Sequence, residues 1–332
     1  MTTTHVRPLR NAWCGAELAA FVGRVRCLLR TLAHGVARLL APSRREAGAR
    51  LGAYVLRQPL GEGAAGEVWA AVHWLSRRPV ALKLAKLDAK APAASRCGLG
   101  ARMALAGRIA ARFSGPHVPR VEGGGRLLDG TPYLAMELIE GRTLAAHARA
   151  EGPLEPGRAR AILRSVAEGL ADLHRAGVVH RDIKPANLIL RADRPEPTVT
   201  LLDFGLARDL GDPEPTDAGS VCGTPAFLAP EAITGGAVAG TEADVYALGA
   251  VAFVLLTGTV PFRGRTAVEV LAKSVADPPP PLPPTVPRRL AGLVSACLAK
   301  RPQDRPSAAS IVRALGREED AEGSPGRPAL VA

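Results

Sequence analysis

Residues 180–187 read His180-Arg181-Asp182-Ile183-Lys184-Pro185-Ala186-Asn187 and follow a helical pattern that stops at Gly177. This stretch brings a carboxylate, an ammonium group and a side-chain amide onto one loop, at Asp182, Lys184 and Asn187. Such a set can accept a hydroxyl proton, steady a departing phosphoryl charge and bind a magnesium ion. It is the most specific string in the chain.

Two further motifs follow on the carboxyl-terminal side. Asp203-Phe204-Gly205 comes directly after the short apolar strand pattern of residues 198–202 and supplies a second carboxylate for a metal ion. Residues 223–231 read Gly-Thr-Pro-Ala-Phe-Leu-Ala-Pro-Glu and close the segment that begins at Asp203.

Two motifs precede the loop. Gly61, Gly63 and Gly66 fit G-x-G-x-x-G, and β-type sequence lies on both sides of them. This context predicts a hairpin tip that folds over phosphates with its backbone N–H groups, because a dinucleotide-binding loop would lead from a strand into a helix. Val80-Ala81-Leu82-Lys83 then follows on a predicted strand, where the Lys83 ammonium group would hold phosphates.

With these motifs in this order, the chain from about Tyr54 to Leu315 resembles serine/threonine protein kinases, especially the bacterial eukaryotic-like (Hanks-type) ones. The resemblance implies an α+β fold of two lobes within a domain at 51–315. The small lobe, about 54–140, would be mostly β with one helix, and the large lobe, about 141–315, mostly α. It also implies transfer of the γ-phosphate of ATP, with Mg²⁺, to Ser/Thr hydroxyls of protein substrates, including autophosphorylation in the activation segment.

The resemblance assigns roles position by position. Asp182 would be the catalytic base, and Lys184 would steady the charge on the departing phosphoryl group. Asn187 and Asp203 would bind Mg²⁺. The gatekeeper position would be Met136, and the hinge that meets adenine would begin at Glu137. The residues implied at ATP are Gly61, Glu62, Gly63, Gly66, Val68, Ala81, Lys83, Met136, Glu137 and Ile139.

Other positions match regulatory or structural residues of such kinases. Thr216, Ser220 and Thr224 are the candidate phosphorylation sites in the activation segment. Glu231 and Arg305 match a buried ion pair of the large lobe. Asp244 matches an aspartate that supports the catalytic loop, although the T-x-x-D spacing from Thr241 allows a helix cap equally well. His180 is expected to pack in support of the loop and not to act as a base.

One part of the sequence departs from the family pattern. The small-lobe helix normally carries a glutamate that pairs with the strand lysine, but Ala106 stands at that place, and residues 89–121 contain no acidic residue. Lys83 is therefore expected to turn toward Asp203, unless Glu62, Glu67 or Asp88 substitutes for the missing acid. This departure keeps open a nucleotide-binding pseudokinase that acts as a scaffold or allosteric partner. A small-molecule phosphotransferase is disfavoured by residues 223–231.

The hydrophobic pattern gives the expected elements. Residues 54–60, 67–74 and 79–85 predict three antiparallel strands, residues 118–124 and 131–138 two more, and residues 89–113 a helix. Helical periodicity follows around Ile162–Leu173, over 243–256, at 290–298 and at 311–315. The proline-rich residues 277–287 predict a rigid connector between helices, with a ligand for an SH3-type domain as the alternative.

Composition limits the class of protein. The 332 residues are 47% hydrophobic and 22% charged, which is typical of a globular protein. The formal net charge of +12 is concentrated near the start, where residues 1–50 hold nine arginines against Glu17 and Glu46. Aromatic residues make up only 4%, and no nucleic-acid module is visible, so we expect no nucleic-acid partner. The five cysteines form no CxxC pair, which argues against disulfides and zinc.

Residues 1–50 are expected to be a basic, amphipathic extension that ends in a linker at 41–50. Leucines and valines recur at helical spacing over 18–40, with arginines between them. The favoured interpretation is packing on the main domain or on another chain, and the alternative is adsorption to an anionic membrane surface. The arginines interrupt any membrane span and no signal peptide is visible, which predicts a cytoplasmic protein. Residues 316–332 are expected to be a disordered tail.

Overall fold

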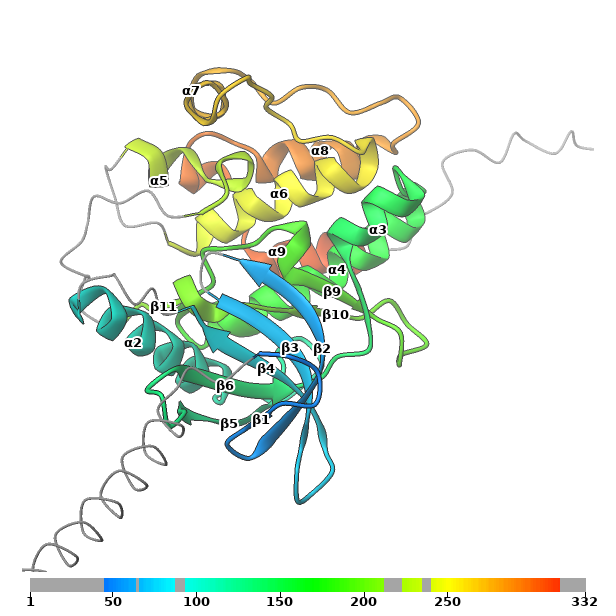
Figure 1. Ribbon diagram of the computed structural model, residues 1–332. Coiled ribbons are helices and arrows are strands. Elements are labelled where there is room, and N and C mark those ends of the chain that lie inside the picture. The colour runs from blue at the N-terminus through cyan, green and yellow to red at the C-terminus, as the bar shows by residue number, and fades with distance from the viewer. Residues whose placement is uncertain (1–44, 64–65, 87–92, 212–222, 235–239, 317–332) are drawn as a thin grey trace, which may run out of the picture.

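The structure, a computed structural model, describes residues 45–63, 66–86, 93–211, 223–234 and 240–316. Within these ranges the chain forms a small lobe of strands with one helix and a larger, mostly helical lobe (Figure 1). The predicted α+β, two-lobed architecture is confirmed.

The small lobe is a six-stranded antiparallel sheet in the order β1-β2-β3-β4-β6-β5. Its interior is apolar, and Leu56, Leu82, Leu84 and Ala135 have no exposed surface. Alternation of such residues with outward-facing ones fixes the register of the central strands, because a slip of one residue would turn the apolar set to solvent. The bounds of the strands are β1 (Arg50–Leu51), β2 (Tyr54–Gly63), β3 (Gly66–His73), β4 (Pro79–Ala85), β5 (Val121–Arg126) and β6 (Pro132–Glu137).

The small lobe begins upstream of the expected boundary. Arg45 forms an ion pair with Glu67 of β3, and the Gly48 N–H donates to the Leu56 carbonyl over 2.9 Å. Arg50 pairs with Val55 in the sheet. The linker expected over 41–50 is therefore wrong for residues 45–50, since the Arg45 ion pair and the backbone hydrogen bonds of residues 48–50 attach this stretch to the sheet. The amphipathic stretch 18–40 and the tail from 317 lie outside the described residues.

The helix of the small lobe is α2 (Ala93–Ala110). Ala106, at 7% exposure, lies in a buried cluster with Ala110 and Phe204, and Phe204 belongs to the short 3-10 helix η2 (Phe204–Leu206). One turn before Ala106, Met103 packs with Ala85 at the end of β4. The position that lacks the acid is thus between the strand of Lys83 and the start of the activation segment.

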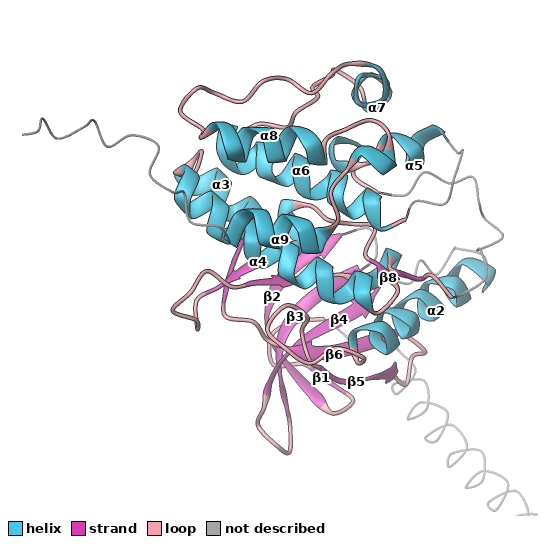
Figure 2. Cartoon of the chain, turned by 180° about the vertical axis from the view of Figure 1, so that it is seen from behind, coloured by secondary structure: helices cyan, strands magenta, loops and turns pink. Residues whose placement is uncertain are grey.

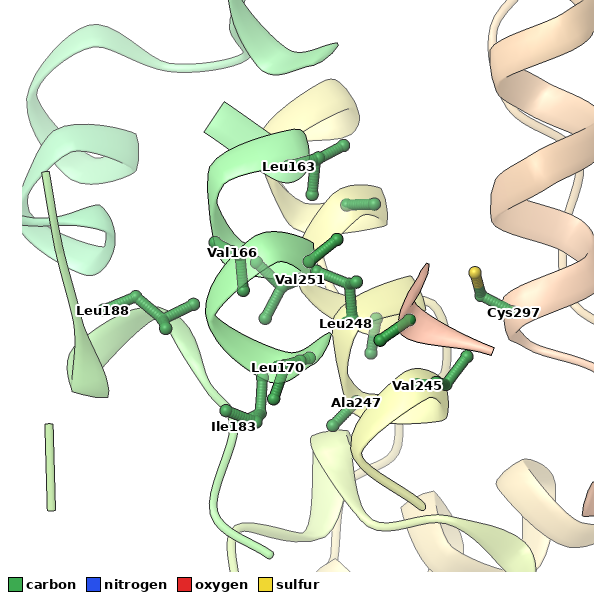
Figure 3. Packing of buried hydrophobic residues seen from close by; sticks show 14 of the residues in the cluster. Leu163, Val166, Leu170, Ile183, Leu188, Val245, Ala247, Leu248, Val251 and Cys297 are labelled. Atoms are coloured by element: carbon green, nitrogen blue, oxygen red, sulfur yellow. The ribbon is translucent and has the colours of Figure 1, made fainter. Parts of the chain in front are cut away.

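The large lobe is built around α4 and α6, which pack against one another (Figure 2). Leu170, Val166 and Val251 are fully buried between them, and Cys297 closes one side of this cluster (Figure 3). Burial raises the pKa of the Cys297 thiol to about 12. The helices are α3 (Leu144–Glu151), α4 (Pro156–Arg175), α5 (Pro230–Thr234), α6 (Thr241–Thr257), α7 (Ala267–Ala276), α8 (Arg288–Cys297) and α9 (Ala308–Gly316).

Short strands and 3-10 helices carry the loops between the lobes. A three-stranded sheet has the order β10-β9-β7, and β11 pairs with β8. These elements are β7 (Gly141–Thr143), β8 (Val178–Val179), β9 (Leu188–Arg191), β10 (Val199–Leu201), β11 (Arg208–Asp209), η1 (Pro185–Asn187), η3 (Pro225–Phe227) and η4 (Pro302–Asp304). The proline-rich residues 277–287 connect α7 to α8, as expected of a connector.

The start of α6 corrects one interpretation. The residue that precedes the helix is Gly240, without a side-chain cap, and Thr241 is the first helical residue. Asp244 is 1% exposed and accepts hydrogen bonds from another loop instead of capping its own helix. The helix-cap interpretation of Thr241 and Asp244 is therefore wrong, because a tertiary contact takes the carboxylate.

Candidate active site

The loop at residues 180–187 holds its polar groups against one another. Lys184 Nζ lies 2.9 and 2.8 Å from the two carboxylate oxygens of Asp182. Asn187 Nδ2 donates to Asp182 Oδ2 over 2.7 Å and to the Asp182 carbonyl over 2.9 Å. The structure therefore brings together the three residues that the sequence singled out, with the carboxylate fixed in direction.

Asp244 of α6 anchors this loop. Its oxygens accept the backbone N–H groups of His180 and Arg181, each over 2.8 Å, and His174 Nε2 lies 2.9 Å away. Arg181 has a positive φ of 66°, an uncommon conformation for a residue with a side chain, which a well-anchored loop can hold. A buried carboxylate with three donors is fully satisfied, so Asp244 fixes the backbone on either side of the turn.

His180 supports the loop as packing, as the sequence suggested. Its ring is fully buried and lies 4.9 Å from the Phe204 ring between centroids. Nε2 lies 3.0 Å from the Leu202 carbonyl, and the Asp182 N–H approaches Nδ1 at 3.3 Å. Burial lowers the pKa of His180 despite the nearby carboxylates, which keeps the imidazole neutral.

Asp203 and Lys83 form an ion pair between the lobes. Lys83 Nζ lies 2.6 Å from Asp203 Oδ1, and Asp203 has a left-handed backbone with φ of 63°. Burial alone would raise the pKa of Asp203, but the Lys83 charge and the Gly205 N–H outweigh it and hold the pKa below its usual value. The expected turn of Lys83 toward Asp203 is confirmed.

The alternative acids in the described part of the chain point elsewhere. Glu67 pairs with Arg45 and accepts from the Trp69 indole over 2.8 Å, and Glu62 pairs with Lys86 at 2.8 Å. Asp88 lies outside the described residues. Neither described glutamate substitutes for the acid that α2 lacks.

The glycine motif lies where β2 ends and β3 begins, with Gly61 opposite Val68 and Gly63 opposite Gly66. Gly66 has φ of +144°, and a Cβ there would lie 2.0 Å from the Leu84 carbonyl oxygen. The position requires glycine, because β4 approaches the backbone so closely. Residues 64 and 65 lie outside the described residues.

The expected adenine-facing positions lie on adjacent strands. Val68 of β3 pairs with Lys83 of β4, and Ala81 of β4 pairs with Met136 of β6. Glu137 is the last residue of β6, and the half-buried Ile139 follows in the connection to the large lobe.

The remaining predicted positions divide into described and undescribed ones. Arg305 and Glu231 form a two-pronged ion pair at 2.7 and 2.8 Å, and the Arg305 side chain has no exposed surface. Its other N–H groups reach three backbone carbonyls, so the pair is structural. Thr224 immediately precedes η3. Thr216 and Ser220 lie outside the described residues.

The donor set fits a magnesium ion bound together with phosphates. An amide oxygen and a carboxylate are the hard oxygen ligands that Mg²⁺ prefers, and they lie on adjacent segments, because the Leu202 N–H donates to the Asn187 carbonyl over 2.8 Å. Within the described ranges no cluster of three or more His, Cys, Asp or Glu side chains could hold a metal by itself. Phosphate oxygens would complete the coordination.

Sequence reasoning missed three arginine contacts around the site. Arg191 contacts Glu137, Arg112 contacts Asp209, and Arg45 contacts Glu67. None belongs to a motif, and their partners are distant in sequence. The one local signal is Arg191, a charged residue at the end of the apolar strand Leu188–Arg191.

Comparison with known proteins gives one family. The model of the protein kinase domain matches residues 54–315. The chain is 37% identical over 276 residues to the serine/threonine-protein kinase PkaA of Streptomyces coelicolor, covering 79% of this chain and 49% of that protein. It is 36% identical to PknD of Mycobacterium tuberculosis over 78% of this chain and 38% of that protein, and 35% identical to PknH of Mycobacterium bovis over 82% and 44%. The chain thus spans less than half the length of these relatives.

Proposed function

The chain belongs to the protein kinase family, and from that premise we propose that it transfers the γ-phosphate of ATP, with Mg²⁺, to serine or threonine hydroxyls of protein substrates. The observation that carries this proposal is the Asp182 carboxylate, held by Lys184 and Asn187 on a loop that the buried Asp244 anchors. The relatives named above are all serine/threonine-protein kinases, which favours the same activity and gives the scaffold alternative no support.

The chain's own residues supply the groups for an in-line transfer. Asp182 accepts the proton of the attacking hydroxyl, and its fixed direction reduces the entropy lost on reaching the transition state. Lys184 stabilises charge on the transferring phosphoryl group. Lys83 would exchange its contact with Asp203 for the phosphates of the nucleotide. A magnesium ion bound by Asn187 and Asp203 would neutralise charge on the phosphates.

The proposal also includes autophosphorylation and docking. Thr216, Ser220 and Thr224 are the hydroxyls that autophosphorylation would modify. Residues 18–40 would dock the kinase to a protein or to an anionic membrane surface from the cytoplasm, an idea that their alternation of leucine, valine and arginine supports. In the described part of the chain, no helix has the length and apolar character needed to cross a membrane.

A phosphotransfer assay with Asp182→Asn tests the activity. The full chain, incubated with γ-labelled ATP and Mg²⁺, should label itself and a generic basic protein substrate, and Asp182→Asn should reduce labelling by at least about a hundredfold. Asp172→Asn, the same change at a half-exposed position on α4, serves as the matched control and should label like wild type. Equal labelling by wild type and Asp182→Asn would contradict the proposal.

A further inference from the structure

Arg191 connects β9 of the large lobe to Glu137, the first residue of the hinge. It ends β9, and its side chain is only 6% exposed. Nη2 donates to Glu137 Oε1 over 2.9 Å, while Nε and Nη2 hold the two oxygens of Asp193 at 2.8 Å each. Nη1 reaches Thr200 Oγ1 at 3.4 Å. One guanidinium group thus joins the last residue of the small-lobe sheet to two strands of the large lobe.

The partners of Arg191 are themselves held in place. The second oxygen of Glu137 faces the Arg120 N–H at 3.3 Å, and the Glu137 N–H donates to the Arg120 carbonyl over 2.8 Å. Thr200 Oγ1 donates to the Pro116 carbonyl over 2.6 Å. The network therefore also includes the segment between α2 and β5. The start of the hinge is held both by Arg191 of β9 and by this segment.

The electrostatics favour a permanent charge at this place. Hydrogen bonds with Asp193 and Glu137 raise the pKa of the Arg191 guanidinium against the opposing effect of burial. In return, the guanidinium lowers the pKa of Asp193 to about 2. A planar fork that satisfies two carboxylates at once is geometry that arginine provides and lysine does not.

We propose that Arg191 is a positioning residue for the hinge and thereby sets the affinity and selectivity for adenine nucleotides. The inference rests on the proposed function, in which the backbone from Glu137 to Ile139 meets adenine. Hydrogen bonds to a base weaken steeply with misalignment, and the Arg191 contact holds the start of that backbone from the large lobe. Arg191 touches neither Asp182 nor Lys184, so it acts on binding and not on the chemical step.

The test measures nucleotide binding and turnover separately in Arg191→Met. Calorimetry with ADP should give a Kd about tenfold higher than wild type, and KM for ATP should rise by a similar factor while kcat stays within about twofold, the pattern of lost uniform binding. The preference for ATP over GTP should narrow. Arg191→Lys should recover part of the affinity, since it keeps the charge without the fork. Arg194→Met, at an exposed position nearby, is the matched control and should bind ADP like wild type.

The Glu137 side of the contact provides a second route, which applies even if Arg191→Met does not fold. Glu137→Gln should weaken ADP binding as well, and the double variant should bind no more weakly than Arg191→Met, because Arg191→Met alone already removes the Arg191–Glu137 contact. Unchanged ADP affinity in folded Arg191→Met, or a fall in kcat without a change in KM, would overturn the inference. A wild type that binds ADP but transfers no phosphate would overturn the proposed function and leave the hinge inference standing.

Discussion

The loop that carries Asp182 in the large lobe and the strand lysine Lys83 of the small lobe are held in opposite ways. Asp182 is fixed by neighbours from its own loop, and Asp244 fixes that loop from within the same lobe. Lys83 instead pairs with Asp203 of the other lobe, and α2 has Ala106 at the place where the family resemblance leads us to expect an acid. The direction of the Asp182 carboxylate is thus set within one lobe, whereas the position of Lys83 depends on how the two lobes meet and, in the proposed function, on the nucleotide.

The largest expected effect comes from breaking the rigid side of this comparison. Asp244→Asn replaces one acceptor oxygen with a donor that faces a backbone N–H, so the loop loses its anchor. We expect kcat to fall on the order of a hundredfold, with stability reduced by about 3 kcal/mol, as when one partner of a buried charged group is removed. Urea unfolding and initial-rate kinetics measure the two effects.

Thr241→Ala is the informative control for that variant. If the T-x-x-D pair capped α6, this change would cost about 1 kcal/mol. Because Gly240 precedes the helix and Asp244 contacts the catalytic loop, Thr241→Ala should leave stability and kcat close to wild type. A loss of stability in Thr241→Ala as large as that in Asp244→Asn would contradict the anchoring role.

A smaller effect is expected where α2 contacts the activation segment. Arg112, in the turn just after the end of α2, pairs with Asp209 of β11 and donates to the Ala176 carbonyl over 2.8 Å. Both charged side chains are partly exposed, so Arg112→Met should lower stability by less than about 1 kcal/mol. Activity should fall up to about fivefold, the equivalent of 1 kcal/mol in the barrier, because α2 loses one tie to the segment.

Arg108→Met, at an exposed position in the last turn of α2, is the matched control for Arg112→Met. Equal kinetic effects of the two changes, measured as kcat under saturating ATP, would show that helix charge matters and that the Asp209 contact does not.

The sequence predicted what local pattern and motif order can carry. The strands around Lys83 and the residues that surround Asp182 follow from short-range chemistry, and the structure places them as expected. For Asp244, the sequence allowed two interpretations equally well, a cap of its own helix or a support of the loop at residues 180–187. Both roles need a carboxylate, so the residue type alone could not separate them. Arg191 and Arg112 could not be assigned, since their partners Glu137 and Asp209 are brought near only by the arrangement of the lobes.

A substitution at Ala106 of α2 tests most directly how Lys83 is held. Ala106 lies one turn after Met103, which is in a buried cluster with Ala85 at the end of the Lys83 strand, and one turn before Ala110, which is in the same buried cluster as Phe204. A glutamate at Ala106 would compete with Asp203 for Lys83 and would hold the lysine from within its own lobe. One preorganised charge contact of this kind is typically worth about 3 kcal/mol of transition-state stabilisation, on the order of a hundredfold in rate.

The central measurement is therefore kcat of wild type, Ala106→Glu and Lys83→Met at saturating Mg·ATP, with Ala104→Glu on the exposed side of α2 as the matched control. If Lys83 is held poorly for the phosphates in the natural chain, Ala106→Glu should raise kcat by about tenfold or more. Ala104→Glu should leave kcat unchanged, and Lys83→Met should be nearly inactive. A folded Ala106→Glu with kcat equal to or below that of wild type would contradict the account.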